Sequence, residues 1–209
     1  MRLTVNTFLT IDGVMQGPGG VQEDTSGGFD RGGWLVPFSD PDMGEIVGGW
    51  FGQADAILLG RNTFQMMKTY WSQVTDPDNI VSAKLNGQPK YVVSATLADP
   101  DWGNTTVLSG DIVKEVSQLK DQPGGELQVH GSAMLARSLH EAGLVDDFRL
   151  LVFPVYVGKG KRLFSEGAAP SGFTLVDSRT TSTGAVYSAL TPAPFHAGSV
   201  QVVDGKESA

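Results

Sequence analysis

The stretch that decides the fold runs from Glu126 to Phe164 and reads ELQVHGSAMLARSLHEAGLVDDFRLLVFPVYVGKGKRLF. Apolar and polar residues alternate at its start, which predicts a short strand from Glu126 to Val129. Residues 130–132 form a turn, and the Ser132 hydroxyl can accept hydrogen bonds from the first free N–H groups of a helix. Apolar residues at helical spacing follow, and the nearly continuous apolar run from Phe148 to Val157 predicts a strand buried on both faces.

The turn before the helix has two interpretations. A glycine turn that leads from a strand into a helix leaves free N–H groups and the positive end of the helix dipole facing outward. Gly131 also lets another backbone approach closely, because it has no Cβ. Such a corner suits a phosphate or diphosphate, but a single Gly-Ser pair is a weak motif and also occurs in corners that bind nothing.

Length and charge exclude several classes of protein. The chain has 209 residues, which suits one domain with a sizeable core. We expect that domain to cover residues 1–190, and residues 191–209 to form a C-terminal tail of low apolar content. The 15 basic and 23 acidic residues give a formal charge of −8. This acidic balance argues against nucleic acid and anionic membranes as partners.

The residue types narrow the chemistry further. The chain has no cysteine, so disulfides, thiolate catalysis and cysteine-ligated metals are excluded. Its three histidines are not at metal-ligand spacing, so we expect no metal site. No apolar run is long enough to span a bilayer, and the first residues lead directly into a strand instead of a signal peptide. These observations predict a cytoplasmic protein.

The first part of the chain combines a strand, a long loop and a helix. Leu3 to Phe8 alternates as a strand does. Residues 14–38 show no periodicity and are rich in glycine, so this loop is either a functional lid or partly disordered. We favour the lid, because Trp34 and Phe38 would be costly to leave in water. Asp40 and Pro41 then start a helix whose apolar stripe lies inward. The stripe consists of Met43, Ile46, Val47, Trp50, Phe51 and Ala54.

A second glycine corner follows the next strand. Ala56 to Leu59 reads as a short buried strand, and Gly60-Arg61-Asn62-Thr63 leads from it into a helix. Arg61 is either an ordinary solvated residue or a bidentate partner for a phosphate. Strands and helices alternate to about residue 150, and the chain then ends in a hairpin. This order predicts an α/β fold of three layers, helices on both faces of a mainly parallel sheet with an antiparallel C-terminal edge. The remaining expected elements are helices at Ile80–Leu85 and Asp111–Lys120 and strands at Tyr91–Ser94, Thr106–Leu108, Phe173–Ser182 and Val186–Leu190.

Five motifs in this order make the chain resemble the dihydrofolate-reductase-like superfamily. Within it, the chain is most similar to the C-terminal reductase domain of bacterial riboflavin biosynthesis and its stand-alone relatives. The motifs are LTIDG (Leu9–Gly13), AILLGRNTF (Ala56–Phe64), KYVVS (Lys90–Ser94), LQVHGS (Leu127–Ser132) and the run from Leu144 to Phe164.

The resemblance implies that the chain binds NADPH as its cofactor. It assigns residues 60–63 and Ser94 to the cofactor phosphates, and residues 131–134 to the diphosphate. Residues 12–14, after the first strand, are assigned to the nicotinamide. Relatives often carry Gly-Gly where this chain has His130-Gly131, so His130 either fills space or places an imidazole beside the cofactor. The implied cofactor-binding residues are Asp12, Gly13, Val14, Gly60, Arg61, Asn62, Thr63, Ser94, His130, Gly131, Ser132, Ala133 and Met134.

The resemblance also implies a function. We expect an NADPH-dependent reductase that transfers hydride to a small heterocycle or pyrimidine-ribose, as 5-amino-6-(5-phosphoribosylamino)uracil reductase does. Asp12 and Trp34 are the candidates for catalytic residues. Dihydrofolate reductases carry a pteridine-binding carboxylate on the first helix, and Asp42 and Glu45 lie only roughly in that place. Dihydrofolate reductase activity and a non-catalytic nucleotide-binding sensor or scaffold are the alternatives. Relatives are commonly homodimers, so a homodimer is expected.

Overall fold

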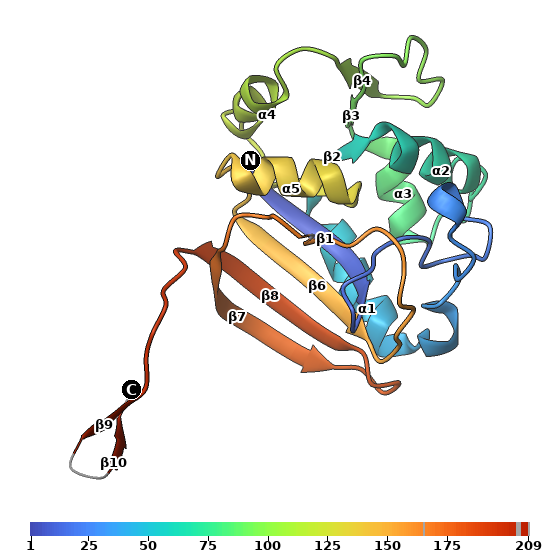
Figure 1. Ribbon diagram of the computed structural model, residues 1–209. Coiled ribbons are helices and arrows are strands. Elements are labelled where there is room, and N and C mark those ends of the chain that lie inside the picture. Colours follow the sequence, from blue (N-terminus) through green and yellow to red (C-terminus); the bar gives the residue numbers. More distant parts are fainter. Residues whose placement is uncertain (165, 204–205, 209) are drawn as a thin grey trace.

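The computed structural model describes residues 1–164, 166–203 and 206–208. An eight-stranded sheet runs through the molecule in the order β4-β3-β2-β5-β1-β6-β8-β7 (Figure 1). Its strands are β1 (Arg2–Thr10), β2 (Ala54–Gly60), β3 (Lys90–Val93), β4 (Thr105–Leu108), β5 (Glu126–Val129), β6 (Asp147–Phe153), β7 (Gly172–Thr180) and β8 (Val186–Ala193). The helices are α1 (Pro41–Gly52), α2 (Arg61–Trp71), α3 (Ile80–Gly87), α4 (Ile112–Lys120) and α5 (Ala133–Glu141), with short 3-10 turns at Ser26–Gly28 and Val36–Phe38.

Strand direction follows the expected pattern. The strands β1 to β6 pair with one another in parallel, whereas β8 pairs antiparallel with both β6 and β7. Parallel pairs need a crossover between strands, and helices on both faces of the sheet supply these crossovers except between β3 and β4, which a loop joins. The expected three-layer α/β fold with an antiparallel C-terminal edge is therefore confirmed.

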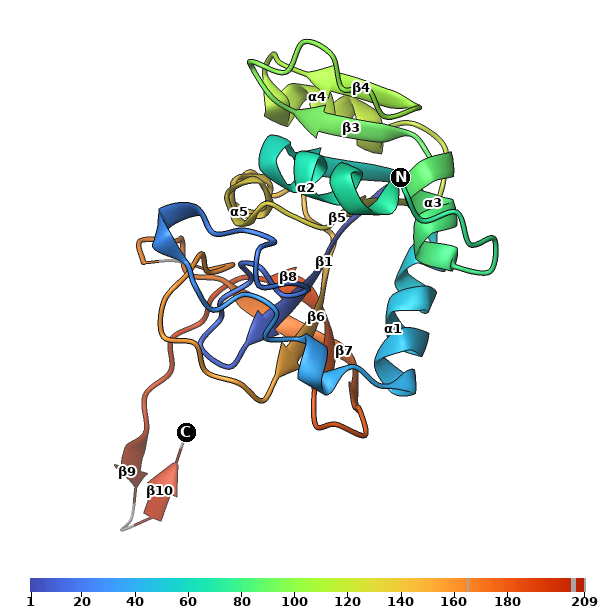
Figure 2. The ribbon, with the colours of Figure 1, turned by 90° about the vertical axis from the view of Figure 1, so that its right-hand side faces the viewer.

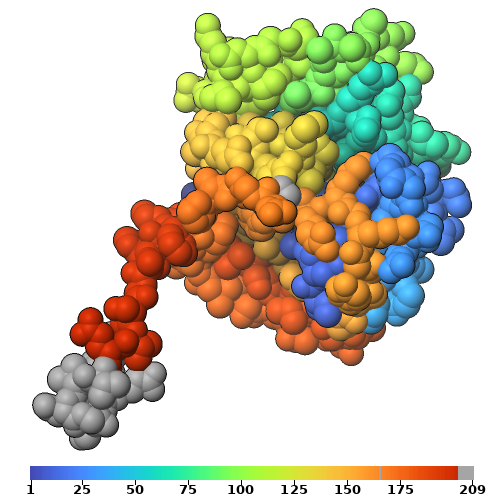
Figure 3. Space-filling view, in the orientation of Figure 1, coloured from blue at the N-terminus to red at the C-terminus, as the bar shows by residue number. Residues whose placement is uncertain are grey.

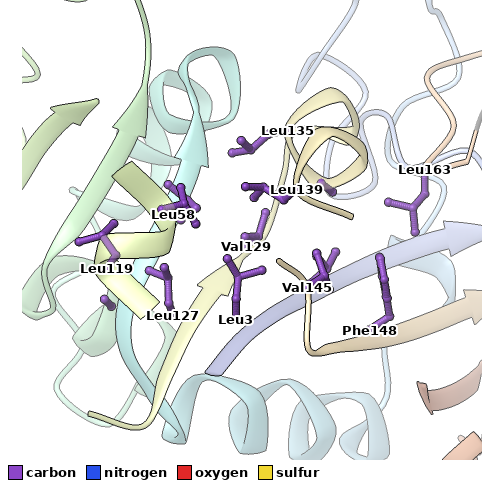
Figure 4. Packing of buried hydrophobic residues seen from close by; sticks show 14 of the residues in the cluster. Leu3, Leu58, Leu119, Leu127, Val129, Leu135, Leu139, Val145, Phe148 and Leu163 are labelled. Atoms are coloured by element: carbon purple, nitrogen blue, oxygen red, sulfur yellow. The ribbon is translucent and has the colours of Figure 1, made fainter. Parts of the chain in front are cut away.

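Alternation along the strands sorts side chains between the two helical layers. On β2, Ile57 and Leu59 pack in one cluster with Phe51 of α1, Phe64 of α2 and Leu85 of α3. The intervening Leu58 faces the other side, where α4 and α5 lie. Figure 2 shows α5 and α1 on opposite sides of the central strands. Figure 4 shows the α4 and α5 cluster, which includes Leu3, Leu58, Leu119, Leu127, Val129, Leu135 and Leu139.

Four of the helices begin at side-chain caps, and two of these caps are aspartates. The Oδ1 atom of Asp40 accepts a hydrogen bond from the Met43 N–H group at 2.7 Å, which fixes the start of α1. This hydrogen bond is the main reason that the pKa of Asp40 falls to about 2. On α4, the Oδ1 atom of Asp111 accepts from the Lys114 N–H group at 3.1 Å. Both helix starts agree with the sequence-based expectation.

Several expected boundaries shift by one or two residues, and Ala54, expected on the first helix, begins β2. Two larger differences lie in the C-terminal part of the chain. The strand expected at Phe148–Val157 ends at Phe153, because Pro154 has no N–H group to donate to a neighbouring strand. The last strand of the domain, expected to end at Leu190, runs to Ala193 and so extends into the expected tail of residues 191–209. That tail also contains β9 (Gln201–Val203), which pairs with β10 (Lys206–Ser208). Its residues 204, 205 and 209 lie outside the described residues.

The loop of residues 14–38 packs onto the body of the protein. Phe29 and Trp34 are buried in the cluster under α1, and the Trp34 indole donates a hydrogen bond to the Gln16 carbonyl at 2.8 Å. Arg31 donates to the Val157 carbonyl at 2.5 Å. Figure 3 shows this loop beside the segment that follows β6. Burial therefore accounts for the aromatic residues Phe29 and Trp34, whereas Val21 and Val36 of the same loop are exposed.

Lys90 is a fully buried lysine at the start of β3. Its ammonium donates hydrogen bonds to the carbonyls of Leu85 and Gln88, at 2.8 and 3.1 Å, and lies 4.9 Å from the centre of the Trp102 ring. The ammonium therefore satisfies two carbonyl oxygens at the end of α3 without a carboxylate partner. Burial lowers the pKa of Lys90 to about 8.

This pKa predicts how stability changes with pH. Between pH 8 and 10.5, the folded protein has lost the Lys90 proton and the unfolded chain still holds it, so this group makes unfolding less favourable as pH rises. Urea unfolding at several pH values should show that rise in the wild type and in a control Lys114→Met variant, which replaces an exposed lysine. Lys90→Met should lose this component of the slope. An unchanged slope in Lys90→Met would contradict the assignment.

Candidate functional site

The parallel sheet brings the expected site residues to one edge. The carboxyl ends of the parallel strands meet there, because all of these strands run in the same direction. Asp12 follows β1, residues 60–63 follow β2, Ser94 follows β3 and residues 130–134 follow β5. Ligands of open α/β sheets bind at this edge. The strands β3, β2 and β5 are neighbours in the sheet. The candidate site consists of the three segments that follow them.

The two glycine corners touch each other. The Gly60 N–H group donates a hydrogen bond to the Gly131 carbonyl at 3.0 Å. A Cβ on Gly60 would lie 2.8 Å from the Ser132 hydroxyl oxygen, and one on Gly131 would lie 3.0 Å from the Thr63 hydroxyl oxygen. Gly131 also has a φ of +138°, which side chains rarely adopt. Both glycines are therefore required by close packing of the corners.

Two helix starts lie side by side at this contact. Gly60 precedes α2 and offers no side chain to cap it, so the first N–H groups of α2 have no side-chain partner at the cap. Ser132 precedes α5, and its hydroxyl accepts a hydrogen bond from the Leu135 N–H group at 3.4 Å, near the upper limit for such a bond. Free N–H groups and two positive helix ends favour an anion here.

A basic and hydroxyl-bearing cluster stands next to these helix starts. Arg61, at the start of α2, is exposed and donates a hydrogen bond to the Thr96 hydroxyl. The Ser94 hydroxyl in turn accepts from the N–H groups of Thr96 and Leu97, at 3.2 and 3.0 Å. Arg61 and Ser94 are thus joined through Thr96, which the sequence analysis did not select. The available signal was a second hydroxyl residue two positions after Ser94.

The Asp12 carboxylate is already engaged. It accepts hydrogen bonds from the Thr10 hydroxyl at 2.6 Å and from the Gly158 N–H group at 2.9 Å, and the Arg162 guanidinium lies 3.3 Å away. Burial alone would raise the pKa of Asp12, but these hydrogen bonds outweigh it and hold the pKa below its usual value. Asp12 therefore fixes the segment after β6 and is ionised at neutral pH.

Trp34 and Val14 do not reach the strand-end cluster as free side chains. Trp34 is 6% exposed and packs edge-on against Phe153, with 5.7 Å between the ring centres. Its indole N–H donates a hydrogen bond to the Gln16 carbonyl. Val14 is fully buried and forms a backbone bridge with Arg162. Both residues therefore belong to the core cluster beside α1.

Large apolar side chains stay exposed close to the helix starts. Ile11, directly before Asp12, is 63% exposed, and Met134, in the first turn of α5, is 68% exposed. Ala133, between the glycine corner and Met134, is buried, and Asn62 is exposed on the first turn of α2. Apolar residues around a few convergent polar groups are typical of ligand sites.

A buried polar row runs under α1 and ends at the glycine turn. Arg149 on β6 forms a two-pronged ion pair with Glu126 on β5, and their side chains are 13% and 8% exposed. Glu126 contacts Gln128, which contacts His130. Removing one partner of a buried ion pair costs about 3–5 kcal/mol. Breaking the row would therefore destabilise the fold. In the sequence, the row is visible only as polar residues that alternate with apolar ones in a short strand.

His130 closes this row. Its ring is half-buried and stacks on Phe51 of α1, with 4.5 Å between ring centres and 5° between planes. Burial, with a smaller contribution from the Arg149 charge, lowers the pKa of His130 to about 3. The imidazole is therefore neutral at physiological pH.

Other parts of the molecule offer little for a nucleotide. A hollow of about 190 Å³ lies between the second half of α5 and residues 166–168, lined by Arg137 and Glu141. It is distant from the glycine corners in the fold and too small for a dinucleotide. Across the described residues, no group of three side chains is placed to hold a metal ion. Within the same residues, no helix has the length and apolar character that crossing a membrane requires.

The comparisons with known proteins agree with this architecture. The RibD C-terminal domain family model matches residues 2–187, so the chain belongs to this reductase-type family. An uncharacterized protein of Bacillus subtilis (strain 168), YyaP, is 32% identical over 187 residues, which cover 88% of this chain and 92% of YyaP.

Solved structures of low sequence identity share the fold. A putative riboflavin biosynthesis protein from Shewanella sp. PV-4 superposes with a TM-score of 0.70 and 21% identity, covering 92% of this chain and 99% of that one. Dihydrofolate reductase from Enterococcus faecalis, solved with NADP(H), superposes with a TM-score of 0.55 and 14% identity, covering 91% and 96%. The suspected dihydrofolate-reductase-like fold is confirmed.

The contact between the corners can be tested by adding one methyl group. Gly60→Ala should lower the free energy of unfolding by about 1–3 kcal/mol, because the new Cβ meets the Ser132 hydroxyl. Ser132→Ala in the same chain should recover part of that loss, since it removes the nearest atom. Gly49→Ala in α1, where a Cβ meets nothing within 4 Å, is the matched control and should not destabilise. Equal stability of Gly60→Ala and the wild type in urea would refute the close contact.

Proposed function

We propose that this member of the RibD C-terminal domain family is an NADPH-dependent reductase that delivers hydride to a pyrimidine-ribose or similar small heterocycle. The observation that carries the proposal is the contact between two helix-starting glycine corners at the carboxyl edge of the sheet, with Arg61 and Ser94 beside it. Family membership supports a pyrimidine reductase type of activity.

The residues at this edge fit the phosphates of such a cofactor. Gly60 and Gly131 let the two corners pack closely, and the first N–H groups of α2, which no side chain caps, could bind a diphosphate. Arg61 adds a guanidinium that can pair with the extra phosphate of NADPH, and Ser94 and Thr96 add hydroxyl donors. When bound, the nicotinamide would supply the hydride. The protein would supply binding, orientation and exclusion of water.

The structure supports a pyrimidine more than a folate. Asp42 accepts hydrogen bonds from both the N–H and hydroxyl groups of Ser182, with the N–H at 2.7 Å. Glu45 pairs with Arg179 at 3.4 Å. Both carboxylates on α1 are thus turned to the β7–β8 turn and strand β7. They are not placed to bind a pteridine, which weighs against dihydrofolate reductase activity.

A nucleotide-binding sensor is the second candidate, and Asp12 favours it. The Asp12 carboxylate is ionised and surrounded by donors, so it cannot serve as a proton donor at neutral pH. A sensor would bind NADPH without oxidising it in the presence of any pyrimidine riboside or pteridine. Loss of NADPH absorbance with a panel of these compounds separates the two functions.

Arg61 gives the sharpest test of cofactor choice. Arg61→Ala should weaken NADPH binding by about 10-fold to about 100-fold and leave NADH binding nearly unchanged, because the lost charge-assisted hydrogen bond involves only the extra phosphate. Titration followed by the fluorescence of the four tryptophans measures both affinities. Lys68→Ala, on the same helix but paired with Asp101 at 3.0 Å, is the control and should bind both like the wild type. Equal losses for NADPH and NADH in Arg61→Ala would sink this role.

A further inference from the structure

The buried row under α1 fixes where hydrogen-bond donors and acceptors lie. The guanidinium of Arg149 donates two hydrogen bonds to Glu126, Nη1 to Oε2 at 2.8 Å and Nη2 to Oε1 at 2.5 Å. Both carboxylate oxygens of Glu126 thus accept from the guanidinium, so Glu126 serves as the acceptor for its other neighbours.

Glu126 in turn fixes the orientation of the fully buried Gln128 amide. The Gln128 Nε2 atom lies 2.7 Å from Glu126 Oε2 and 2.6 Å from the Trp50 carbonyl oxygen. Both of these neighbours can only accept, so the amide NH₂ group must face them and use both of its protons. The Oε1 atom of Gln128 is therefore an acceptor, and it lies 3.1 Å from Nε2 of His130.

The proton of His130 then has one possible position. The ring is neutral at physiological pH and carries one N–H group, as its burial beside the Arg149 charge requires. Because Gln128 Oε1 only accepts, that proton is on Nε2. The Nδ1 atom is left with a lone pair, since the hydrogen bond that the ring makes among the described residues runs from Nε2 to Gln128.

The position of His130 indicates which kind of ligand group its Nδ1 atom can bind. The ring is held flat against Phe51 and directly precedes Gly131, so it is a rigid acceptor beside the corner assigned to the cofactor. A site built to hydrogen-bond a particular ligand group rejects an analogue that lacks this group, because the site's own polar atom is then unpaired. A neutral imidazole with a free lone pair selects an N–H donor in this way.

We propose that His130 is a specificity-determining residue whose Nδ1 atom accepts a hydrogen bond from an N–H group of the bound ligand. The inference rests on the proposed function and deepens it. The donor is either the carboxamide of the nicotinamide or a ring N–H of the pyrimidine substrate. The ion pair of Arg149 and Glu126 acts through Gln128 and holds the His130 proton in place.

The proton position can be read without any ligand. A long-range ¹H–¹⁵N spectrum of protein labelled with ¹⁵N-histidine should show one ring protonated on Nε2 at neutral pH, and the His130→Phe variant should lose that signal. His140 and His196 supply the internal comparison. A His130 ring protonated on Nδ1, or charged at neutral pH, would overturn the inference whether or not NADPH binds.

Ligand titrations identify the donor. If the carboxamide is the donor, NADPH should shift the Nδ1 resonance and His130→Phe should weaken NADPH by about 3-fold to about 10-fold. The same variant should bind the 3-acetylpyridine analogue of NADPH, which has no carboxamide N–H, as the wild type does. If the pyrimidine is the donor, the shift should require a pyrimidine riboside and vanish with its N-methylated form.

Control variants distinguish the specificity role of His130 from the proposed reductase function. His140→Phe replaces a ring that contacts Phe148 and the Ser171 hydroxyl, away from the glycine corners, and should leave all affinities unchanged. Equal affinities of His130→Phe and the wild type for both NADPH and pyrimidine ribosides would refute the specificity role. Wild-type protein that binds no NADPH at millimolar concentration would instead refute the proposed function, since the ring proton is measured independently.

Discussion

The structure depends on the close approach of two chain corners that lack side chains. The hydrogen bond from Gly60 to Gly131 joins the end of β2 to the turn after β5, and no Cβ fits on either glycine. This contact sets the separation of α2 and α5, which start at these corners and pack on opposite faces of the sheet. Gly60 also leaves the start of α2 without a side-chain cap. Folding and the proposed anion binding thus depend on the same corners.

A second constraint is a row of polar side chains on β5 and β6, which lies between the sheet and α1. The row from Arg149 to His130 is buried among apolar residues, and each member needs its neighbour to satisfy its hydrogen bonds. Half-satisfied rows of this kind are strongly unfavourable, whereas complete ones are rigid. The row ends at the residue before the glycine turn. Stability of the sheet and the orientation of one imidazole therefore depend on the same side chains.

Much of this could be predicted from sequence, for identifiable reasons. Alternation and capping signals predicted the elements, and the two glycine corners that were expected to form the candidate site do lie in contact, because each signal is local. The end of β6 was missed because the apolar run continues past Pro154, although proline cannot donate to a strand. Thr96 and Gln128 were missed because their roles depend on contacts between strands. Asp12 and Trp34 form hydrogen bonds with loop residues distant in sequence, which no local pattern reveals.

The most direct test of the account is an amide ¹H–¹⁵N titration of the wild-type protein with NADPH. The account predicts that the largest shifts fall on residues 60–63, 94–97 and 131–134, which come from three separate parts of the chain. Amides around the hollow near Arg137 and Glu141 should stay in place. Shifts confined to that hollow, or none at millimolar NADPH, would contradict the claim that the glycine corners form a nucleotide site.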